Sequence, residues 1–140
     1  MTRSLKIFII DESKANIALI TAALNKQSYD CEVSSESNAN TALIKLNEMS
    51  RTDKALLPDI ILIGRLDSEL NAVAVLCYLN TANITEQSAA VVVCGYTDYN
   101  DKAVYLNNGA AHVIAWRFDC SELEEGLRVF EEYTKDIAAQ

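Results

Sequence analysis

The stretch Pro58–Asp67, PDIILIGRLD, decides the fold class that the sequence predicts. After its aspartate, the segment Asp59–Ile63 is apolar at every position, whereas a half-exposed strand alternates apolar and polar residues. Strands without alternation are typical of parallel sheets that helices cover on both faces. In such sheets, ligands and reactive groups lie just beyond the carboxyl ends of the strands. Gly64 therefore occupies a position where a reactive side chain is expected.

Apolar runs and helical patterns alternate along the rest of the chain. Further strands are predicted at Leu5–Ile10, Ala89–Cys94 and His112–Ala115, with a weaker, alternating edge strand at Tyr29–Ser34. Apolar residues at helical spacing predict helices over Lys14–Gln27, Ala39–Met49, Asn71–Asn83, Tyr99–Asn108 and Ser121–Ala138. Ser121 and Glu124 form a capping-box pattern at the start of the last helix. The order (βα)₅ predicts an α/β protein with a parallel sheet between two layers of helices.

The composition predicts one folded domain over residues 1–140 and excludes several classes of function. Apolar residues make up 50% of the chain and charged residues 23%, which is ordinary for a globular protein. The net charge of −8 argues against binding to nucleic acid, because that binding depends on neutralising phosphates. No apolar run approaches the ~20 residues that a membrane span needs. The start, MTRSLKIFII, is predicted to be the first strand and not a signal peptide.

The cysteines indicate a reducing, cytoplasmic environment. Cys31, Cys77, Cys94 and Cys120 are scattered, without a CxxC pair, and the chain has 1 histidine. This spacing argues against a zinc site and is typical of reduced thiols.

Candidate functional residues stand at the carboxyl ends of four predicted strands. Asp11 and Glu12 follow the first strand, Gly64 the third and Trp116 the fifth, and Cys94 ends the fourth. Adjacent carboxylates attract a hard divalent cation such as Mg²⁺. The same pair is also compatible with a solvated acidic turn at a helix start, where negative charge is favourable.

Three segments in this order resemble the receiver domain of two-component response regulators. They are IIDES (Ile9–Ser13), PDIILI (Pro58–Ile63) and NNGAAHVIAW (Asn107–Trp116), and the resemblance extends from about Leu5 to Tyr133. It implies a flavodoxin-like three-layer sandwich with a five-stranded parallel sheet in the order 2-1-3-4-5. It also implies a cytoplasmic role in bacterial signal transduction.

The resemblance implies that active receivers use an acidic pair, a phosphoacceptor aspartate, a threonine or serine, and a lysine. Asp11 and Glu12 match the acidic pair, whereas Gly64 falls on the phosphoacceptor, Cys94 on the hydroxyl position and Trp116 on the lysine position. Glycine supplies no nucleophile, a thiol is a weak hydrogen-bonding group, and an indole has no positive charge. The chain is therefore interpreted as a pseudo-receiver that is not an enzyme, undergoes no aspartyl phosphorylation at residue 64 and needs no cofactor beyond weakly bound Mg²⁺ at the acidic pair.

Alternatives remain open at this stage. Asp67 lies three residues beyond Gly64 and is the candidate for a displaced phosphoacceptor. Cys94 is a candidate redox sensor, and the scaffold also suits a small-ligand sensor. The guanidinium of Arg65 or Arg117 is a candidate to neutralise the acidic pair, and the indole of Trp116 is a candidate to fill the space left at residue 64.

The favoured function is a phosphorylation-independent protein–protein interaction module. By the resemblance, a protein partner or a second copy of the chain would bind at the face formed by the fourth helix, the fifth strand and the fifth helix. Tyr96, Tyr99, Tyr105 and His112 are the candidate residues of this face. No nucleic acid and no membrane is expected as a partner.

Overall fold

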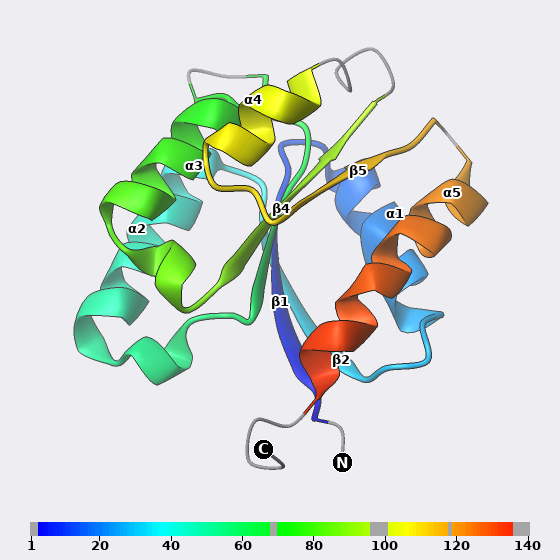
Figure 1. Ribbon diagram of the computed structural model, residues 1–140, viewed down its shortest axis with the longest axis horizontal. Helices are drawn as coiled ribbons and strands as arrows, with labels where there is room; N and C mark the ends of the chain where they lie inside the picture. The colour runs from blue at the N-terminus through cyan, green and yellow to red at the C-terminus, as the bar shows by residue number, and fades with distance from the viewer. Residues whose placement is uncertain (1–2, 68–69, 96–100, 118, 136–140) are drawn as a thin grey trace.

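The computed structural model describes residues 3–67, 70–95, 101–117 and 119–135 of the chain. Its centre is a five-stranded sheet in the order β2-β1-β3-β4-β5, and every neighbouring pair is parallel (Figure 1). The strands are β1 (Leu5–Ile10), β2 (Cys31–Glu36), β3 (Ile60–Ile63), β4 (Ala89–Cys94) and β5 (His112–Ala115). This order is the predicted one, so the flavodoxin-like fold is confirmed.

Helices cover both faces of the sheet. Helices α1 (Lys14–Asn25) and α5 (Cys120–Leu127) lie on one face, and α2 (Ala39–Thr52), α3 (Ala72–Thr81) and α4 (Lys102–Asn107) lie on the other (Figure 1). Short 3₁₀ helices occur at η1 (Lys54–Leu56), η2 (Ile84–Glu86) and η4 (Arg128–Thr134). In the part of the chain that the structure describes, no helix is long and apolar enough to cross a membrane.

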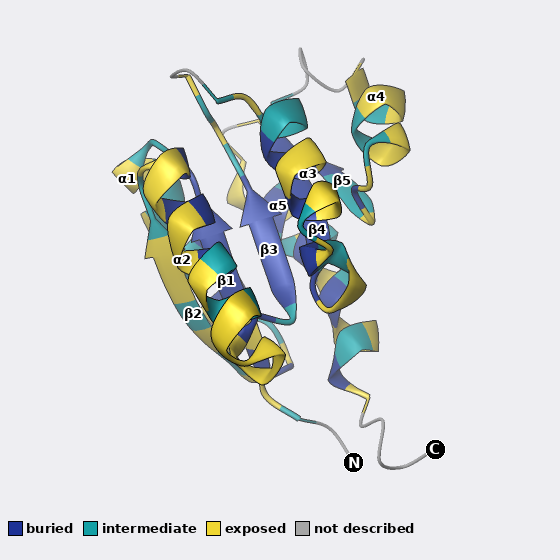
Figure 2. Cartoon of the chain, turned by 90° about the vertical axis from the view of Figure 1, so that its left-hand side faces the viewer, coloured by how far each residue is buried: buried dark blue, intermediate teal, exposed yellow. Residues whose placement is uncertain are grey.

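The central position of strand β3 in the sheet explains why its sequence is apolar throughout. Each of its residues is 0% exposed, and Figure 2 shows the strand enclosed between helices. Ile61 and Ile63 pack into the core under α2 and α3, whereas Ile60 and Leu62 pack into the core under α1 and α5. The strand therefore joins two hydrophobic cores. Burial of each side chain of this size stabilises the fold by roughly 1.5–3 kcal/mol.

Two predicted boundaries are wrong at the ends of the chain's edge elements. Strand β2 begins at Cys31 and not at Tyr29, because the Tyr29 ring is buried under α1 and α5 and its hydroxyl donates to the Leu127 carbonyl at 2.8 Å. Helix α5 begins earlier than predicted, with Asp119 as its N-cap in place of Ser121; the Asp119 carboxylate accepts from the Ser121 N–H at 2.9 Å. After Leu127 the chain tightens into η4. The predicted start of the fourth helix, Tyr99, lies outside the described residues.

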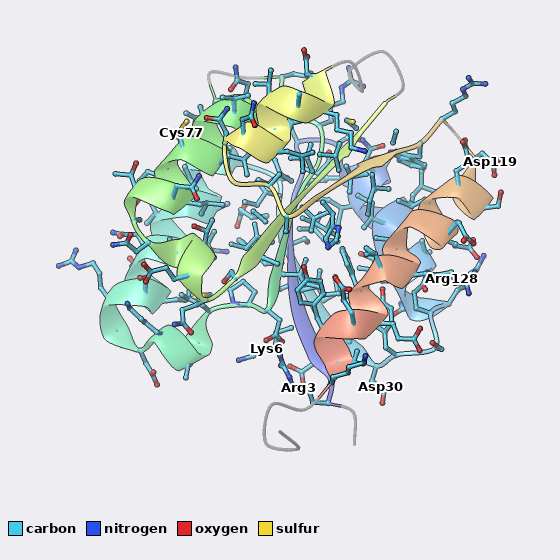
Figure 3. All side chains as sticks on the ribbon, in the orientation of Figure 1. Arg3, Lys6, Asp30, Cys77, Asp119 and Arg128 are labelled. Atoms are coloured by element: carbon cyan, nitrogen blue, oxygen red, sulfur yellow. The ribbon has the colours of Figure 1, made fainter. Side chains whose placement is uncertain are left out.

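The basic residues at and just before the start of β1 lie at the opposite end of the sheet from the candidate site. Arg3 pairs with Asp59 at 2.8 Å, and the Lys6 ammonium donates to the Ala55 carbonyl at 3.0 Å (Figure 3). Both contacts are at the amino ends of the strands. These cations therefore do not reach the acidic turn at the carboxyl ends.

Candidate functional site

The loops after β1 and β3 are joined by backbone hydrogen bonds. The Gly64 N–H donates to the Ile10 carbonyl at 2.8 Å and continues the ladder between the two strands. One residue further, the Glu12 N–H donates to the Arg65 carbonyl at 2.9 Å. These bonds bring the predicted acidic turn directly against the glycine at the phosphoacceptor position.

The side chain of Asp11 occupies the space beside Gly64. A Cβ atom built on Gly64 would overlap Asp11 Oδ2 and lie 2.8 Å from Asp11 Cγ, and its three nearest heavy atoms all belong to Asp11. The structure therefore places the Asp11 carboxylate in this space, and the idea that the indole of Trp116 fills part of it stays a prediction. Any side chain at residue 64 would require the carboxylate to move.

Two backbone N–H groups hold the Asp11 carboxylate in this place. The Ser13 N–H donates to Oδ1 at 2.8 Å, and the Arg65 N–H donates to Oδ2 at 3.1 Å. The residue is 1% exposed, so these bonds replace the water that the carboxylate has in the unfolded chain. Asp11 thereby connects the loop after β1 to the loop after β3.

Burial dominates the electrostatics of Asp11. Desolvation raises the pKa of its carboxyl above the ordinary 3.8, and the N–H groups of Ser13 and Arg65 oppose this shift without cancelling it. The charge of the Arg65 side chain is the smallest of the opposing effects. The pocket is therefore an unfavourable environment for additional negative charge.

The donor set does not fit a tight site for a divalent cation. Each Asp11 oxygen already accepts a backbone hydrogen bond, and Gly64 offers no side-chain oxygen. Among the described residues, no group of three or more histidine, cysteine, aspartate or glutamate side chains could hold a metal ion. Weak Mg²⁺ binding at Asp11 and Glu12 stays a prediction.

Arg65 and Asp67 pair with each other in the loop after β3. Arg65 Nε donates to Asp67 Oδ2 at 2.8 Å, and both side chains are largely exposed, at 67% and 62%. Arg65 therefore contacts Asp11 through its backbone N–H, while its guanidinium pairs with Asp67 in place of the acidic pair. The backbone N–H of Arg117 donates to Glu122 at 3.3 Å, and the predicted role of its guanidinium stays a prediction.

Cys94 and Trp116 lie at the ends of neighbouring strands and face different cores. The Trp116 N–H donates to the Cys94 carbonyl at 3.0 Å. Cys94 is 8% exposed and packs into the core under α2 and α3, whereas the half-buried Trp116 packs against the core under α1 and α5. The burial of Cys94 restricts access of oxidants to its thiol.

The predicted partner face contains residues with internal contacts. His112 Nε2 lies 3.1 Å from the Tyr133 hydroxyl and 3.3 Å from Glu132 Oε1, so its ring packs against η4. Tyr105 is partly buried against the core under α2 and α3. Tyr96 and Tyr99 lie outside the described residues.

A groove at this face was not predicted from the sequence. It has a volume of about 1010 Å³ and runs between α4 and α5, with residues 111–115 at its base. Its walls include Leu106 of α4 and Glu122, Glu125 and Val129 of the α5–η4 segment. The sequence did contain a sign of this surface. Helix α4 carries apolar residues, although it buries none of them.

Comparisons with known proteins give the fold its class. No protein-family model and no curated protein matches the chain. Among solved structures, the phosphorylated cyanobacterial phytochrome response regulator RcpA is 22% identical with a TM-score of 0.76, and the match covers 94% of each chain. The Mn²⁺-bound response regulator Rcp1 is 15% identical with a TM-score of 0.74, over 95% of this chain and 96% of that one.

The response regulator domain of Thermotoga maritima CheB is similar in the same way. It is 16% identical with a TM-score of 0.73, over 94% of this chain and 96% of its own. At these identities the likeness is one of fold. The chain therefore has the fold of receiver domains, as the sequence predicted, and its function has to be argued from its own residues.

Proposed function

We propose that the chain is a degenerate receiver that acts as a phosphorylation-independent protein–protein interaction module in bacterial signal transduction. One observation carries the proposal: the Asp11 carboxylate fills the space that the side chain of residue 64 would take. A receiver that accepts a phosphoryl group needs a nucleophile and an open, cation-binding pocket there. This chain has a glycine and a buried carboxylate held by two backbone N–H groups.

The other two altered positions support the same conclusion. Cys94 and Trp116 provide neither the hydroxyl nor the positive charge that would hold phosphoryl oxygens. The chain would therefore work without catalysis and without a required cofactor. Its conformation would be constant or set by a partner.

The partner surface belongs to the same proposal. A partner protein or a second copy would bind at α4, β5 and α5, where the groove lies. Val104 and Leu106 of α4 are 44% and 40% exposed, so this face offers apolar side chains to a partner.

The alternatives have specific obstacles. The Asp67 carboxylate is exposed, but it pairs with Arg65, and a phosphoacceptor there would lie in a solvated loop. Cys94 is too buried for a fast redox sensor.

Incubation with acetyl phosphate and Mg²⁺, followed by intact mass measurement, tests the proposal. The native chain is expected to gain no phosphoryl group. An adduct on the native chain would contradict the proposal, and its loss in Asp67→Asn would assign the displaced carboxylate. A Mg²⁺ titration followed by thermal unfolding tests the acidic pair in parallel, and only a weak effect is expected.

A further inference from the structure

The two edge strands of the sheet differ in how well their residues prevent pairing with a further strand. Edge strand β2, CEVSSE, carries Glu32 and Glu36, and its alternate side chains are exposed. Edge strand β5, HVIA, has no charged residue, proline or glycine. Charges on an edge strand normally prevent unwanted pairing, so β2 is protected and β5 is not. Within the described residues, no strand lies beyond β5.

The backbone of β5 presents hydrogen-bonding groups to the groove. At the end of the ladder, the Trp116 N–H donates to the Cys94 carbonyl, in the register that pairs Cys94 with Ala115. Backbone groups alternate in direction along a strand, so those of His112 and Ile114 also point to β4. The N–H and C=O groups of Val113 and Ala115 consequently point away from β4, into the groove.

One wall of the groove, formed by α4, is apolar at Leu106 and charged at Lys102. Helix α4 buries none of its residues, and Figure 2 shows it largely exposed beside β5. Leu106 lines the groove, with Lys102 at the start of the helix. An apolar side chain of a partner would therefore be favoured beside Leu106.

The opposite wall is acidic. The α5–η4 segment, CSELEEGL followed by RVFEEYT, contains five glutamates and one basic residue, Arg128. Arg128 pairs with Glu125 at 3.1 Å on the solvent-facing side of the segment, near its middle (Figure 3). Glu122 and Glu125 line the groove, so this wall favours a basic partner side chain.

We infer that the groove accepts an extended segment of a partner protein, which pairs with β5 as a sixth strand and alternates apolar with basic residues. Side chains of a strand point to opposite faces in turn. Every second residue would lie over α4, beside Leu106, and the others over α5, beside Glu122 and Glu125. The inference rests on the proposed function and specifies the partner that the interaction module would take.

A second copy of the chain fits this edge less well. Antiparallel pairing of two β5 strands around a twofold axis would place α5 of one copy beside α5 of the other. Their glutamates would then repel each other, in a chain whose net charge is −8. A basic segment has the complementary charge.

The probe is a fluorescein-labelled eight-residue peptide of alternating valine and lysine, measured by fluorescence anisotropy with the native chain. Its control has the same composition in two blocks, Val₄Lys₄. The alternating peptide is expected to bind at least tenfold more tightly, because only it matches both walls. Equal binding of the two peptides would overturn the inference, as would failure of the alternating peptide to bind.

Backbone methylation distinguishes strand pairing from simple charge attraction. N-methylation of all valines and N-methylation of all lysines remove N–H groups from opposite edges of the bound strand. One of the two peptides is expected to lose binding at least tenfold more than the other. Equal effects of the two methylations would contradict pairing with β5.

Two variants locate the site. Leu106→Lys, which puts a cation on the apolar wall, is expected to weaken the alternating peptide about tenfold, while Ile44→Lys, on the exposed face of α2, leaves binding unchanged. Equal binding to all three chains would place the peptide elsewhere. A native dimer in light scattering that Leu106→Lys dissociates and the peptide does not would favour a second copy and overturn the inference. None of these results affects the acetyl phosphate test, so the two proposals fail separately.

Discussion

The pocket at Gly64 and the groove at β5 differ in whether the fold itself satisfies the hydrogen bonds of their polar groups. In the pocket, a buried carboxylate accepts hydrogen bonds from Ser13 and Arg65 and fills the space that a side chain would take. In the groove, backbone groups of β5 point outward between an apolar wall and an acidic wall. A polar group that the fold already satisfies contributes to stability, whereas one that it leaves open is available to a partner. The polar groups of the Gly64 pocket therefore contribute to stability, and those of the sheet edge to the proposed binding.

The largest effect is expected from Gly64→Asp, which puts an aspartate at the position that matches the phosphoacceptor of active receivers. The new carboxylate would collide with Asp11 and add a second charge to a buried site. The free energy of unfolding is expected to fall by about 3–5 kcal/mol in urea denaturation. Gly95→Ala is the control, because a Cβ there meets nothing within 4 Å. An unchanged stability of Gly64→Asp would show that Asp11 moves aside easily.

Asp11→Ala is expected to have a smaller but clear effect on stability. The change leaves the N–H groups of Ser13 and Arg65 without their acceptor at a buried position. The expected loss in free energy of unfolding is about 2 kcal/mol. Urea denaturation measures it, and a loss below the error of that method would mean that Asp11 does not connect the loops.

The raised pKa of Asp11 predicts a pH dependence of stability. The folded state holds the Asp11 proton more tightly than the unfolded state, so the native chain should lose stability as pH rises from 3.8 through the raised pKa. Asp11→Asn has no titrating carboxyl at this position, so its stability should lack this part of the pH dependence. Urea denaturation of both chains between about pH 4 and pH 7 gives the difference. A native chain that gains stability relative to Asp11→Asn over this range would contradict the assignment.

The smallest effect on stability is expected at the groove. Leu106 is 40% exposed on a helix that buries no residue, so Leu106→Lys should change the free energy of unfolding by less than about 0.5 kcal/mol. Thermal or urea denaturation tests this. A loss comparable with that of Asp11→Ala would mean that α4 is part of the core, and the contrast between pocket and groove would not hold.

Most of the fold could be predicted because it depends on local periodicity. Leu5–Ile10, Ala89–Cys94 and His112–Ala115 are strands as predicted, since each is a short, mostly apolar run of the kind typical of buried strands. The start of β2 was missed at Tyr29, which is buried although it lies in the loop before the strand. Alternation of polar and apolar residues marks a strand but does not show where its pairing begins.

The candidate site was predictable in its residues and not in its geometry. The match to the receiver pattern identified Asp11 and Gly64, but their contact depends on the register between β1 and β3, which pairs Ile10 with Ile63. That register places the residue after each strand against the other. Side-chain volumes alone suggested Trp116 as a residue that fills part of this space, but they could not show that Asp11 lies nearest to Gly64 and is held there by two backbone N–H groups.

A double-mutant cycle between Gly64→Ala and Asp11→Ala tests the central claim most directly. Gly64→Ala is expected to cost about 2 kcal/mol in the native chain, because its Cβ displaces the Asp11 carboxylate. In the Asp11→Ala background the same change should cost less than about 0.5 kcal/mol, because the carboxylate is gone. An interaction energy of about 1.5 kcal/mol would confirm that Asp11 fills the pocket, and additive effects of the two changes would contradict it.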